Sequence, residues 1–377
     1  MKNFILAVSM FCGTVIGVGM FGLPYVAAKV GFMPVLIYFG VIGLVMMVIQ
    51  LMYGEICLRT REEHRLPGYV EIYLGKKYKF LPILSNSVGL YGANLAYILV
   101  GGTFLANLLI PIFGGGLFTY HMIFFAVGAL LIYSGSGTIA KSEFVSMAVF
   151  FLVLLFLAVK SLPQIDIYNL LESDLSFKNL ILPYGVILFS LSGMSVIPET
   201  REILKTKFER LKNVIILGTL IPIITYLIFI ITVLGVTGAN TSTDALSGLV
   251  PFFDKKFLAA GFISGIIATF TSYLTIGTTI KKILWYDLKL SHLISSGLAI
   301  FVPLALYLLG LQNFLTIVAF TGAVTMGIDV VLIALVYLKA QKLGDRKPEY
   351  QALVPKTALY FLIGLFLIGV VLNLFPL

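Results

Sequence analysis

The stretch GTVIGVGMFGLPY, residues 13–25, lies inside the first long apolar run of the chain. It ends just after a proline and contains four closely spaced glycines, Gly13, Gly17, Gly19 and Gly22. A glycine in a helix interior costs about 1 kcal/mol relative to alanine, and an unpaired backbone group in hydrocarbon costs several kcal/mol. The stretch therefore predicts a break in a membrane-crossing helix, buried in protein or lining a cavity.

The whole chain has the composition of an integral membrane protein. Its 377 residues are 59% hydrophobic and 11% charged, whereas a soluble protein carries about 25% charged residues. The mean hydropathy is +1.05. Cys12 and Cys57 both lie in apolar runs, so we expect packing residues and no disulfide framework. We expect one transmembrane domain, residues 1–377, in a multi-pass protein surrounded by the lipid bilayer.

Eleven apolar runs approach the roughly 20 residues that a helix needs to cross a bilayer. None shows the alternation of a barrel strand, so the predicted fold is all-α with eleven transmembrane helices. The runs are 4–30, 34–58, 81–110, 118–134, 143–162, 179–199, 213–236, 257–280, 290–310, 313–338 and 357–375.

The net charge of +9 is distributed as a topology signal. Along an eleven-span path, all but five of the 26 lysines and arginines fall in loops on one side; the exceptions are Lys29, Lys160, Lys178, Lys255 and Lys256. Positively charged loops remain in the cytoplasm. We therefore expect a cell-membrane protein with a cytoplasmic N-terminus and an extracytoplasmic C-terminus, and no nucleic-acid partner is needed to explain the charge.

A second break is predicted in the sixth run, at LFSLSGMSVIPE, residues 188–199. It lies five spans after the first and runs in the opposite direction. Interrupted helices at matching places in two halves indicate the binding site of an inverted-repeat transporter. The repeats would cover about 4–162 and 179–338, with an extra helix at about 357–375. The alternative is that these small residues only allow close helix packing.

The two breaks suggest the chemistry of a substrate. A half-helix that begins after the first break points its N-terminal N–H groups and positive dipole end at the break, which suits a carboxylate. Freed carbonyls near Phe189 and Ser190 in the second break suit an ammonium group. A molecule that carries both charges is an amino acid.

Four stretches resemble the amino acid/auxin permease family, near the bacterial aromatic amino acid permeases. GTVIGVGMFGLPYVAAKVGF is similar to the family's first-span signature, and FSLSGMSVIPETREILK to its sixth. The stretches SVGLYGANLAYILVGG (87–102) and ATFTSYLTIG (268–277) fit as well. The resemblance implies a leucine-transporter-type 5+5 inverted-repeat fold with discontinuous helices 1 and 6, and cation-coupled amino acid uptake by alternating access.

The resemblance also implies a set of substrate-binding residues. The carboxylate would meet the backbone at Gly17, Val18 and Gly19 and the Thr14 hydroxyl. The amine would meet the carbonyls of Phe189, Ser190 and Ser192. Tyr91, Asn94 and Tyr97 would line the side-chain pocket, and their spacing of three allows a shared helix face; ordinary packing is the alternative for the tyrosines.

A sodium site follows from the spacing in the eighth run together with the resemblance. Ala268, Thr271, Ser272 and Thr275 are spaced to share one stripe of a helix, and in the family fold that stripe faces the first break. The expected ligands are hard oxygens, which suit sodium: the carbonyls of Gly13, Ile16 and Ala268 and the hydroxyls of Thr271 and Ser272. Alternatively, the hydroxyls bond back to their own helix.

Proton coupling remains an alternative because two carboxylates, Asp329 and Glu55, lie within apolar runs. Proton-coupled relatives often carry a lysine in the middle of the fifth span, where this chain has VSMAVFFLVLL, and this favours sodium. No H-E-x-x-H or G-x-S-x-G motif supports a membrane-embedded enzyme, and no filter-like repeat supports a channel. The absence of a charge near the breaks favours a neutral amino acid. We expect no cofactor, and the sequence leaves the oligomeric state open.

Overall fold

The computed structural model describes residues 2–134 and 139–374, and this part of the chain is helical with no strand. Residues 135–138, within the first expected repeat, and residue 375, at the end of the last expected span, lie outside the described residues. The α-helices are α1 (Lys2–Val15), α2 (Gly19–Val30), α3 (Phe32–Arg59), α4 (Leu66–Leu74), α5 (Phe80–Phe113), α6 (Leu117–Ser134), α7 (Ile139–Ser161), α8 (Tyr168–Leu171), α9 (Phe177–Ser190), α10 (Ile197–Leu204), α11 (Leu211–Thr237), α12 (Lys255–Lys282), α13 (His292–Leu308), α14 (Phe314–Phe320), α15 (Gly327–Leu343) and α16 (Lys356–Leu374).

A helix coincides with each of the eleven apolar runs. Within the described residues, eight helical segments are long and apolar enough to cross a membrane, and the pair α1 and α2 forms a ninth that is bent by 55°. The runs expected as the fifth and ninth spans correspond to the shorter apolar helices Ala148–Gln164 and His292–Leu308. The prediction of an all-helical, multi-pass membrane protein is therefore confirmed.

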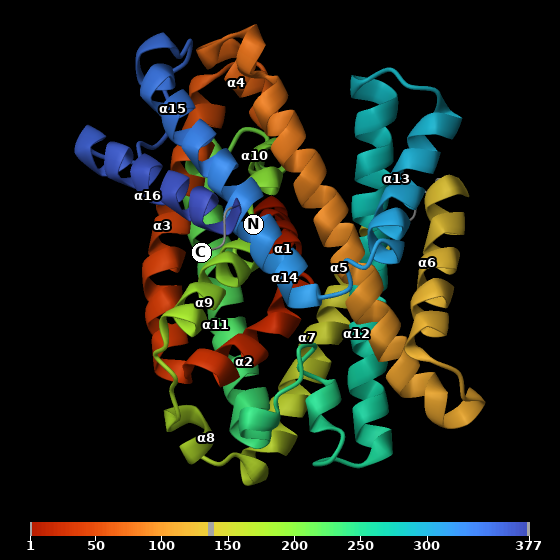
Figure 1. Ribbon diagram of the computed structural model, residues 1–377. Coiled ribbons are helices and arrows are strands. Elements are labelled where there is room, and N and C mark those ends of the chain that lie inside the picture. The colour runs from red at the N-terminus through yellow and green to blue at the C-terminus, as the bar shows by residue number, and fades with distance from the viewer. Residues whose placement is uncertain (1, 135–138, 375–377) are drawn as a thin grey trace.

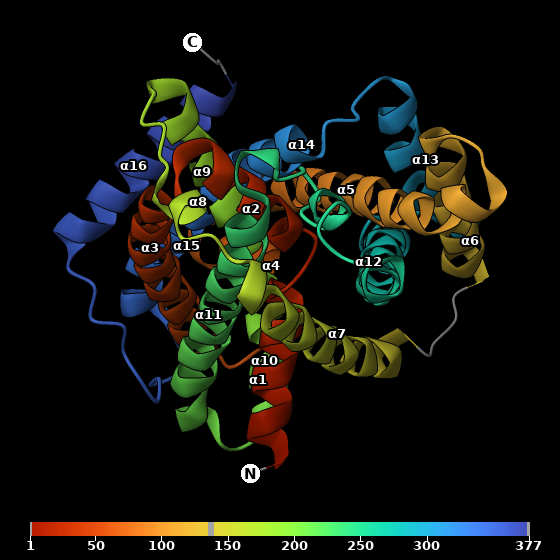
Figure 2. The ribbon, with the colours of Figure 1, turned by 90° about the horizontal axis from the view of Figure 1, so that it is seen from below.

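The helices form two groups that lie side by side (Figures 1 and 2). In one group, α5 and α12 pack along each other, with α6 and α13 on their outer side. In the other group, α11 packs against α1, α2 and α3, and α9 and α10 pack against these helices in turn. α15 packs against α3 and α16, and the segment between α14 and α15 reaches α9 and α5.

The first predicted break lies between α1 and α2, at residues 16–18. Its glycines are required by close neighbours. A Cβ atom at Gly17 would lie 2.7 Å from the Tyr97 hydroxyl oxygen, and one at Gly19 would lie 2.6 Å from the Ser190 hydroxyl oxygen. Side chains from two other helices thus lie so close to Gly17 and Gly19 that a larger residue at either position would force them to shift.

The second predicted break lies between α9 and α10. The α-helix ends at Ser190, and a 3-10 turn (Met194–Val196) leads into α10, which carries Pro198 in its first turn. A Cβ atom at Gly193 would lie 2.6 Å from the Phe11 ring of α1. The two interrupted helices therefore pack against each other at their breaks.

Candidate functional site

The freed carbonyls of the two breaks share one hydrogen-bond donor, Tyr226 of α11. Its hydroxyl lies 2.7 Å from the Val15 carbonyl in the first break and 2.9 Å from the Ser190 carbonyl in the second. The side chain is fully buried. A hydroxyl has one hydrogen to donate, so the two carbonyls share it, and Tyr226 ties the broken helices together.

A second polar chain supports the break in α9–α10. The Gln50 amide of α3 donates to the Leu191 carbonyl at 3.0 Å, and the Thr219 hydroxyl of α11 donates to the Gln50 side-chain oxygen at 2.6 Å. All three residues are buried. Freed backbone groups at membrane depth must find protein partners, and α3 and α11 supply them here. Our reading of the sequence missed these residues, although a glutamine within an apolar run is itself a signal.

A large cavity opens beside the breaks. Its empty volume is about 1010 Å³, which includes the solvent-open space at its mouth. Its lining residues come from both broken helices, from α3, α5 and α12, from the start of α4 and the residue before it, and from α15 and the segment before it. They are Thr14, Val15, Gly17, Gly19, Tyr53, Arg65, Leu66, Asn86, Gly89, Leu90, Ala93, Tyr97, Phe189, Ser190, Ser192, Met194, Ser195, Ile276, Met326 and Asp329.

Seven of the ten residues predicted to bind substrate line this cavity: Thr14, Gly17, Gly19, Tyr97, Phe189, Ser190 and Ser192. The Thr14 hydroxyl donates to the Met10 carbonyl at 3.0 Å, and the Ser190 hydroxyl to the Val186 carbonyl at 2.8 Å. Both oxygens keep lone pairs. The Ser192 hydroxyl lies 2.9 Å from the Met326 sulfur.

The other three predicted residues lie elsewhere. Val18 lines a neighbouring small cavity, and its amide donates to the Tyr97 hydroxyl at 3.4 Å. Tyr91 and Asn94 line neither cavity. Asn94 is fully buried with no hydrogen-bond partner among the described residues. It faces α12, where a Cβ atom at Gly277 would lie 3.5 Å from the amide nitrogen.

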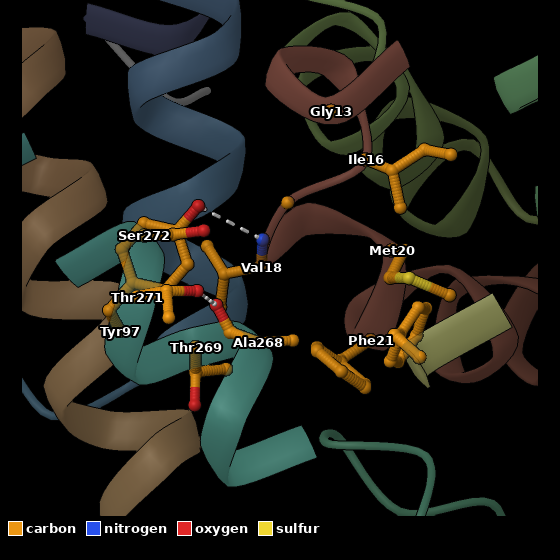
Figure 3. A pocket seen from close by; sticks show the side chains of 12 residues that line it. Gly13, Ile16, Val18, Met20, Phe21, Tyr97, Ala268, Thr269, Thr271 and Ser272 are labelled. Carbon is orange, nitrogen blue, oxygen red and sulfur yellow. Dashed lines mark hydrogen bonds between the residues drawn. The ribbon is translucent and has the colours of Figure 1, made fainter. Parts of the chain in front are cut away.

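The small cavity brings together all five residues predicted to bind sodium, Gly13, Ile16, Ala268, Thr271 and Ser272 (Figure 3). Gly17 and Tyr97 line both cavities, so the two adjoin there. The main-chain hydrogen bonds of the break, such as that from the Ile16 amide to the Cys12 carbonyl, leave the Gly13 and Ile16 carbonyls without a main-chain donor among the described residues. These carbonyls are available to a cation.

Thr271 and Ser272 of α12 lie on the side of this cavity opposite Gly13 and Ile16 (Figure 3). The Thr271 hydroxyl donates back to the carbonyls of Ile267 and Ala268, at 3.0 and 3.1 Å. The hydrogen bonds back to the same helix, which were the alternative to an ion site, are therefore present. They use only the hydrogen of the hydroxyl, and the lone pairs of its oxygen stay free for a cation.

The model of the tryptophan/tyrosine permease family matches residues 1–376. The chain belongs to this family. It is part of the amino acid/auxin permease group, as the resemblance of the two break signatures indicated. The protein is therefore a permease, and the enzyme alternative is set aside on the evidence of the family.

Two curated relatives of this permease show the range of the group. Tyrosine-specific transport system 1 of Haemophilus influenzae is 25% identical over 361 residues, which cover 90% of this chain and 88% of that protein. Glutamine transporter 2 of Aliivibrio fischeri is 26% identical over 272 residues, which cover 69% of this chain and 68% of that protein.

Among solved structures, the permease resembles the crystal structure of MhsT in complex with L-phenylalanine. The TM-score is 0.67 at 18% sequence identity, and the match covers 99% of this chain and 97% of MhsT. The likeness confirms a fold of the leucine-transporter type. At this identity it speaks for the fold alone.

The two intramembrane carboxylates of the permease have different surroundings. Glu55 is fully buried and forms an ion pair with Arg59 at 2.8 Å. It also accepts hydrogen bonds from the Tyr337 hydroxyl and the Ala352 amide, at 3.2 and 2.6 Å. Asp329 lines the large cavity, and Ser85 donates a hydrogen bond to one of its oxygens. Glu55 is thus held by protein groups, whereas Asp329 faces the cavity.

Proposed function

We propose that the chain imports a neutral amino acid, with aromatic side chains favoured, together with sodium by alternating access in a cell membrane. The observation that carries the proposal is that two cavities adjoin at Gly17 in the first break. One is lined by all five residues expected for sodium and the other by seven of the ten expected for the substrate. In this proposal residues 4–162 and 179–338 are inverted repeats, 357–375 is an extra helix, and the N-terminus is cytoplasmic.

The polar ends of the substrate would lie between the breaks. The N-terminus of α2 at Gly19 supports a carboxylate site, because first-turn amides and the helix dipole both favour an anion. The backbone at Phe189 and Ser190 supports an ammonium site, because both residues line the same cavity as Gly19. Thr14 and Ser192 line the same space.

The position of the charged residues in the large cavity supports a substrate with a neutral side chain. The only charged residues lining the large cavity in the described chain are Arg65 and Asp329. Asp329 accepts a hydrogen bond from Ser85. Ser85 lies about 12 Å along α5 from Ala93, which lines the cavity nearer to Tyr97. The cavity around the breaks is lined by Tyr97, Phe189 and small residues instead. An aromatic substrate agrees with a relative named as tyrosine-specific, and the relative named for glutamine keeps the class at neutral amino acids.

The oxygen set of the small cavity supports sodium as the coupling ion. Carbonyls and hydroxyls are hard ligands without a net charge, and they come from the two sides of one narrow space, the first break and α12. One sodium ion that moves down about 100 mV and a tenfold gradient supplies roughly 3–4 kcal/mol. This energy would concentrate a substrate by a few hundred-fold.

Proton coupling through Asp329 is the second candidate. The observation in its favour is a buried carboxylate in the wall of the substrate cavity with one serine as its hydrogen-bond partner. Such residues mark ion and proton pathways in membrane proteins. Glu55 is less suited to this role, because Arg59 and two further donors already stabilise its charge.

The proposal includes a conformational state. The large cavity reaches Tyr53, Arg65 and Leu66 at the predicted cytoplasmic end. At the other end, the buried Phe21 ring packs against Phe104, Phe150 and Phe229 with centroid distances of 5.0, 6.1 and 6.1 Å. Packed aromatic rings exclude water. We infer an inward-facing form with a closed outer side.

The test is uptake of radiolabelled tyrosine, tryptophan, phenylalanine and glutamine into proteoliposomes under an imposed sodium or proton gradient. We expect saturable accumulation driven by sodium and abolished in Thr271→Ala/Ser272→Ala. Thr275→Ala is the matched control, because it removes a hydroxyl from the same helix at a residue that lines neither cavity.

Accumulation that needs only a proton gradient and is lost in Asp329→Asn would replace the sodium proposal with the proton one. Equal loss of uptake in Thr275→Ala would mean that any hydroxyl deletion disturbs α12, and would remove the support for the ion site. The absence of saturable uptake of any of these amino acids would refute the substrate class.

A further inference from the structure

A basic pocket lies where the first turn of α1 meets the connection between α10 and α11. It is lined by Lys2, Asn3, Phe4, Leu204, Lys205, Thr206, Lys207 and Arg210. Its empty volume is about 600 Å³ including the open side. α1 packs against both α10 and α11, and Figure 2 shows its first turn, next to the label N, near the beginning of α11.

Among the described residues, the positive charge of this pocket is compensated by a single long ion pair. Four of its lining residues are cationic, and no acidic residue lines it within the described chain. Lys2, Lys205 and Lys207 are exposed and form no ion pair with a described residue, and the guanidinium of Arg210 is 3.9 Å from its nearest carboxylate, Glu209. By contrast, Arg65 and Lys79, in a loop predicted to lie on the same side of the membrane, have carboxylate partners at 2.7 and 2.6 Å.

The enrichment of lysine and arginine in cytoplasmic loops accounts for basic residues on this predicted side. It does not account for the convergence of four of them on one concave site. The backbone adds to that convergence. Lys205 has φ 55°, a conformation that a side-chain-bearing residue adopts only at a cost. This turn follows the end of α10 directly and is held by hydrogen bonds from the Lys205 and Lys207 amides to the carbonyls of Glu202 and Leu204.

Apolar residues adjoin the cationic residues at this pocket. Leu204 is buried, Phe4 is half-buried, and the Arg210 guanidinium lies 5.9 Å from the centre of the Phe4 ring. On α1, Leu6 and Met10 follow Lys2 at intervals of four, so they share its face. Both are exposed, as is Ile5. An apolar lane for an acyl chain thus leads away from the cationic pocket.

We propose that this pocket binds a phosphate-bearing anion, namely the headgroup of an anionic phospholipid whose acyl chains lie along Ile5, Leu6 and Met10. Basic pockets at the ends of membrane helices recognise such headgroups through charge. The apolar lane favours a lipid over soluble phosphate. The bound headgroup would join the first turn of α1 to the α10–α11 connection.

The experiment measures binding and does not depend on the transported substrate. The full-length protein in neutral detergent is titrated at low ionic strength with phosphatidylglycerol that carries a fluorophore on its acyl chain. The test variant is Lys2→Gln/Lys205→Gln/Lys207→Gln, and Arg210 is kept because it packs on Phe4. Each lost cation is expected to weaken binding about fivefold, and the three together about a hundredfold.

Two further variants make the result specific. Lys339→Gln/Lys342→Gln/Lys347→Gln removes the same charge from exposed positions at the same predicted side and should bind like the unmodified protein. Lys2→Arg/Lys205→Arg/Lys207→Arg, which keeps the three charges, should bind like the unmodified protein. Equal weakening in the Lys339 series would reduce the effect to general electrostatics and overturn the proposal.

Competing ligands separate the two sources of phosphate. Unlabelled phosphatidylglycerol should displace the probe, whereas phosphatidylcholine and inorganic phosphate should not. Displacement by inorganic phosphate as effective as that by phosphatidylglycerol would assign the pocket to a soluble anion and refute the lipid.

Discussion

Replacing Tyr226 with phenylalanine removes one oxygen atom from the point where both broken helices are tied together. The ring itself would stay, because it is fully buried and packs against Phe39 with a centroid distance of 6.2 Å. The change therefore leaves packing intact and deletes the donor shared by the carbonyls of Val15 and Ser190.

The expected loss of stability in Tyr226→Phe depends on how many hydrogen bonds are lost and on whether water can replace them. A buried carbonyl left without a donor costs about 1–3 kcal/mol, and hydrogen bonds between membrane helices contribute about 0.6 kcal/mol on average and at most about 1.7. One hydrogen is lost, and Val15 and Ser190 both line the large cavity, so water can partly replace it. We therefore expect a loss of about 1 kcal/mol.

Thermal unfolding and uptake kinetics measure this loss in the same preparation. We expect Tyr226→Phe to unfold about 2 °C lower and to transport about fivefold more slowly at saturating substrate, because the relative position of the breaks is less fixed. The matched control is Tyr273→Phe. Tyr273 is also a fully buried tyrosine, but its hydroxyl has no hydrogen-bond partner among the described residues, so its removal should cost neither stability nor rate.

If Tyr226→Phe matched the unmodified protein in both measurements, the shared hydroxyl would have no role in holding the breaks. If Tyr273→Phe lost as much as Tyr226→Phe, the loss would report a general response of the core to a missing oxygen.

Gly19→Ala should abolish saturable uptake in proteoliposomes while the protein still folds, because the new methyl group would lie 2.6 Å from the Ser190 hydroxyl. Gly40→Ala is the control, because the space around Gly40 is open, and it should transport normally. Normal transport by both variants would contradict the close approach at Gly19. Glu55→Gln should lower the free energy of unfolding, measured by thermal unfolding, by about 3 kcal/mol, because it leaves Arg59 without its buried partner. An altered ion dependence of uptake without a loss of stability would instead give Glu55 a role in coupling. Gln50→Leu should lower stability by about 1–3 kcal/mol, because it leaves the Leu191 carbonyl without its donor, and an unchanged melting temperature would argue against this support of the second break.

The breaks could be predicted from sequence because they are local. Glycines and a proline inside an apolar run conflict with the requirement that a membrane helix satisfy its own backbone, and the conflict can be read without knowing any neighbour. The structure adds the cause: Tyr97 and Ser190 approach Gly17 and Gly19 too closely for a side chain. The partners of the freed carbonyls could not be predicted, because Tyr226 and Thr219 look like ordinary residues of an apolar helix.

The face of α5 that meets the cavity shows a second limit. Spacing predicted that Tyr91, Asn94 and Tyr97 share a face. The stripe that lines the large cavity is instead Asn86, Gly89, Leu90, Ala93 and Tyr97. Neighbouring residues differ by about 100° around a helix, so Asn94 points away from the wall to which Ala93 belongs. Spacing fixes which residues lie together on a helix, but packing against α12 fixes which way that face turns.

The shared wall of the two cavities suggests how cargo and ion would be coupled in the proposed mechanism. Gly17 lines both spaces, and the next amide, that of Val18, is held by the Tyr97 hydroxyl, which also borders both. An ion bound to the Gly13 and Ile16 carbonyls would fix the backbone just before Gly17, and a carboxylate at Gly19 would fix it just after. Two residues separate these points, so neither ligand can order the break without ordering the other's site. The coupling free energy between ion and substrate then comes from the conformational entropy that this short segment loses when it is ordered. Each ligand raises the affinity for the other by the same factor.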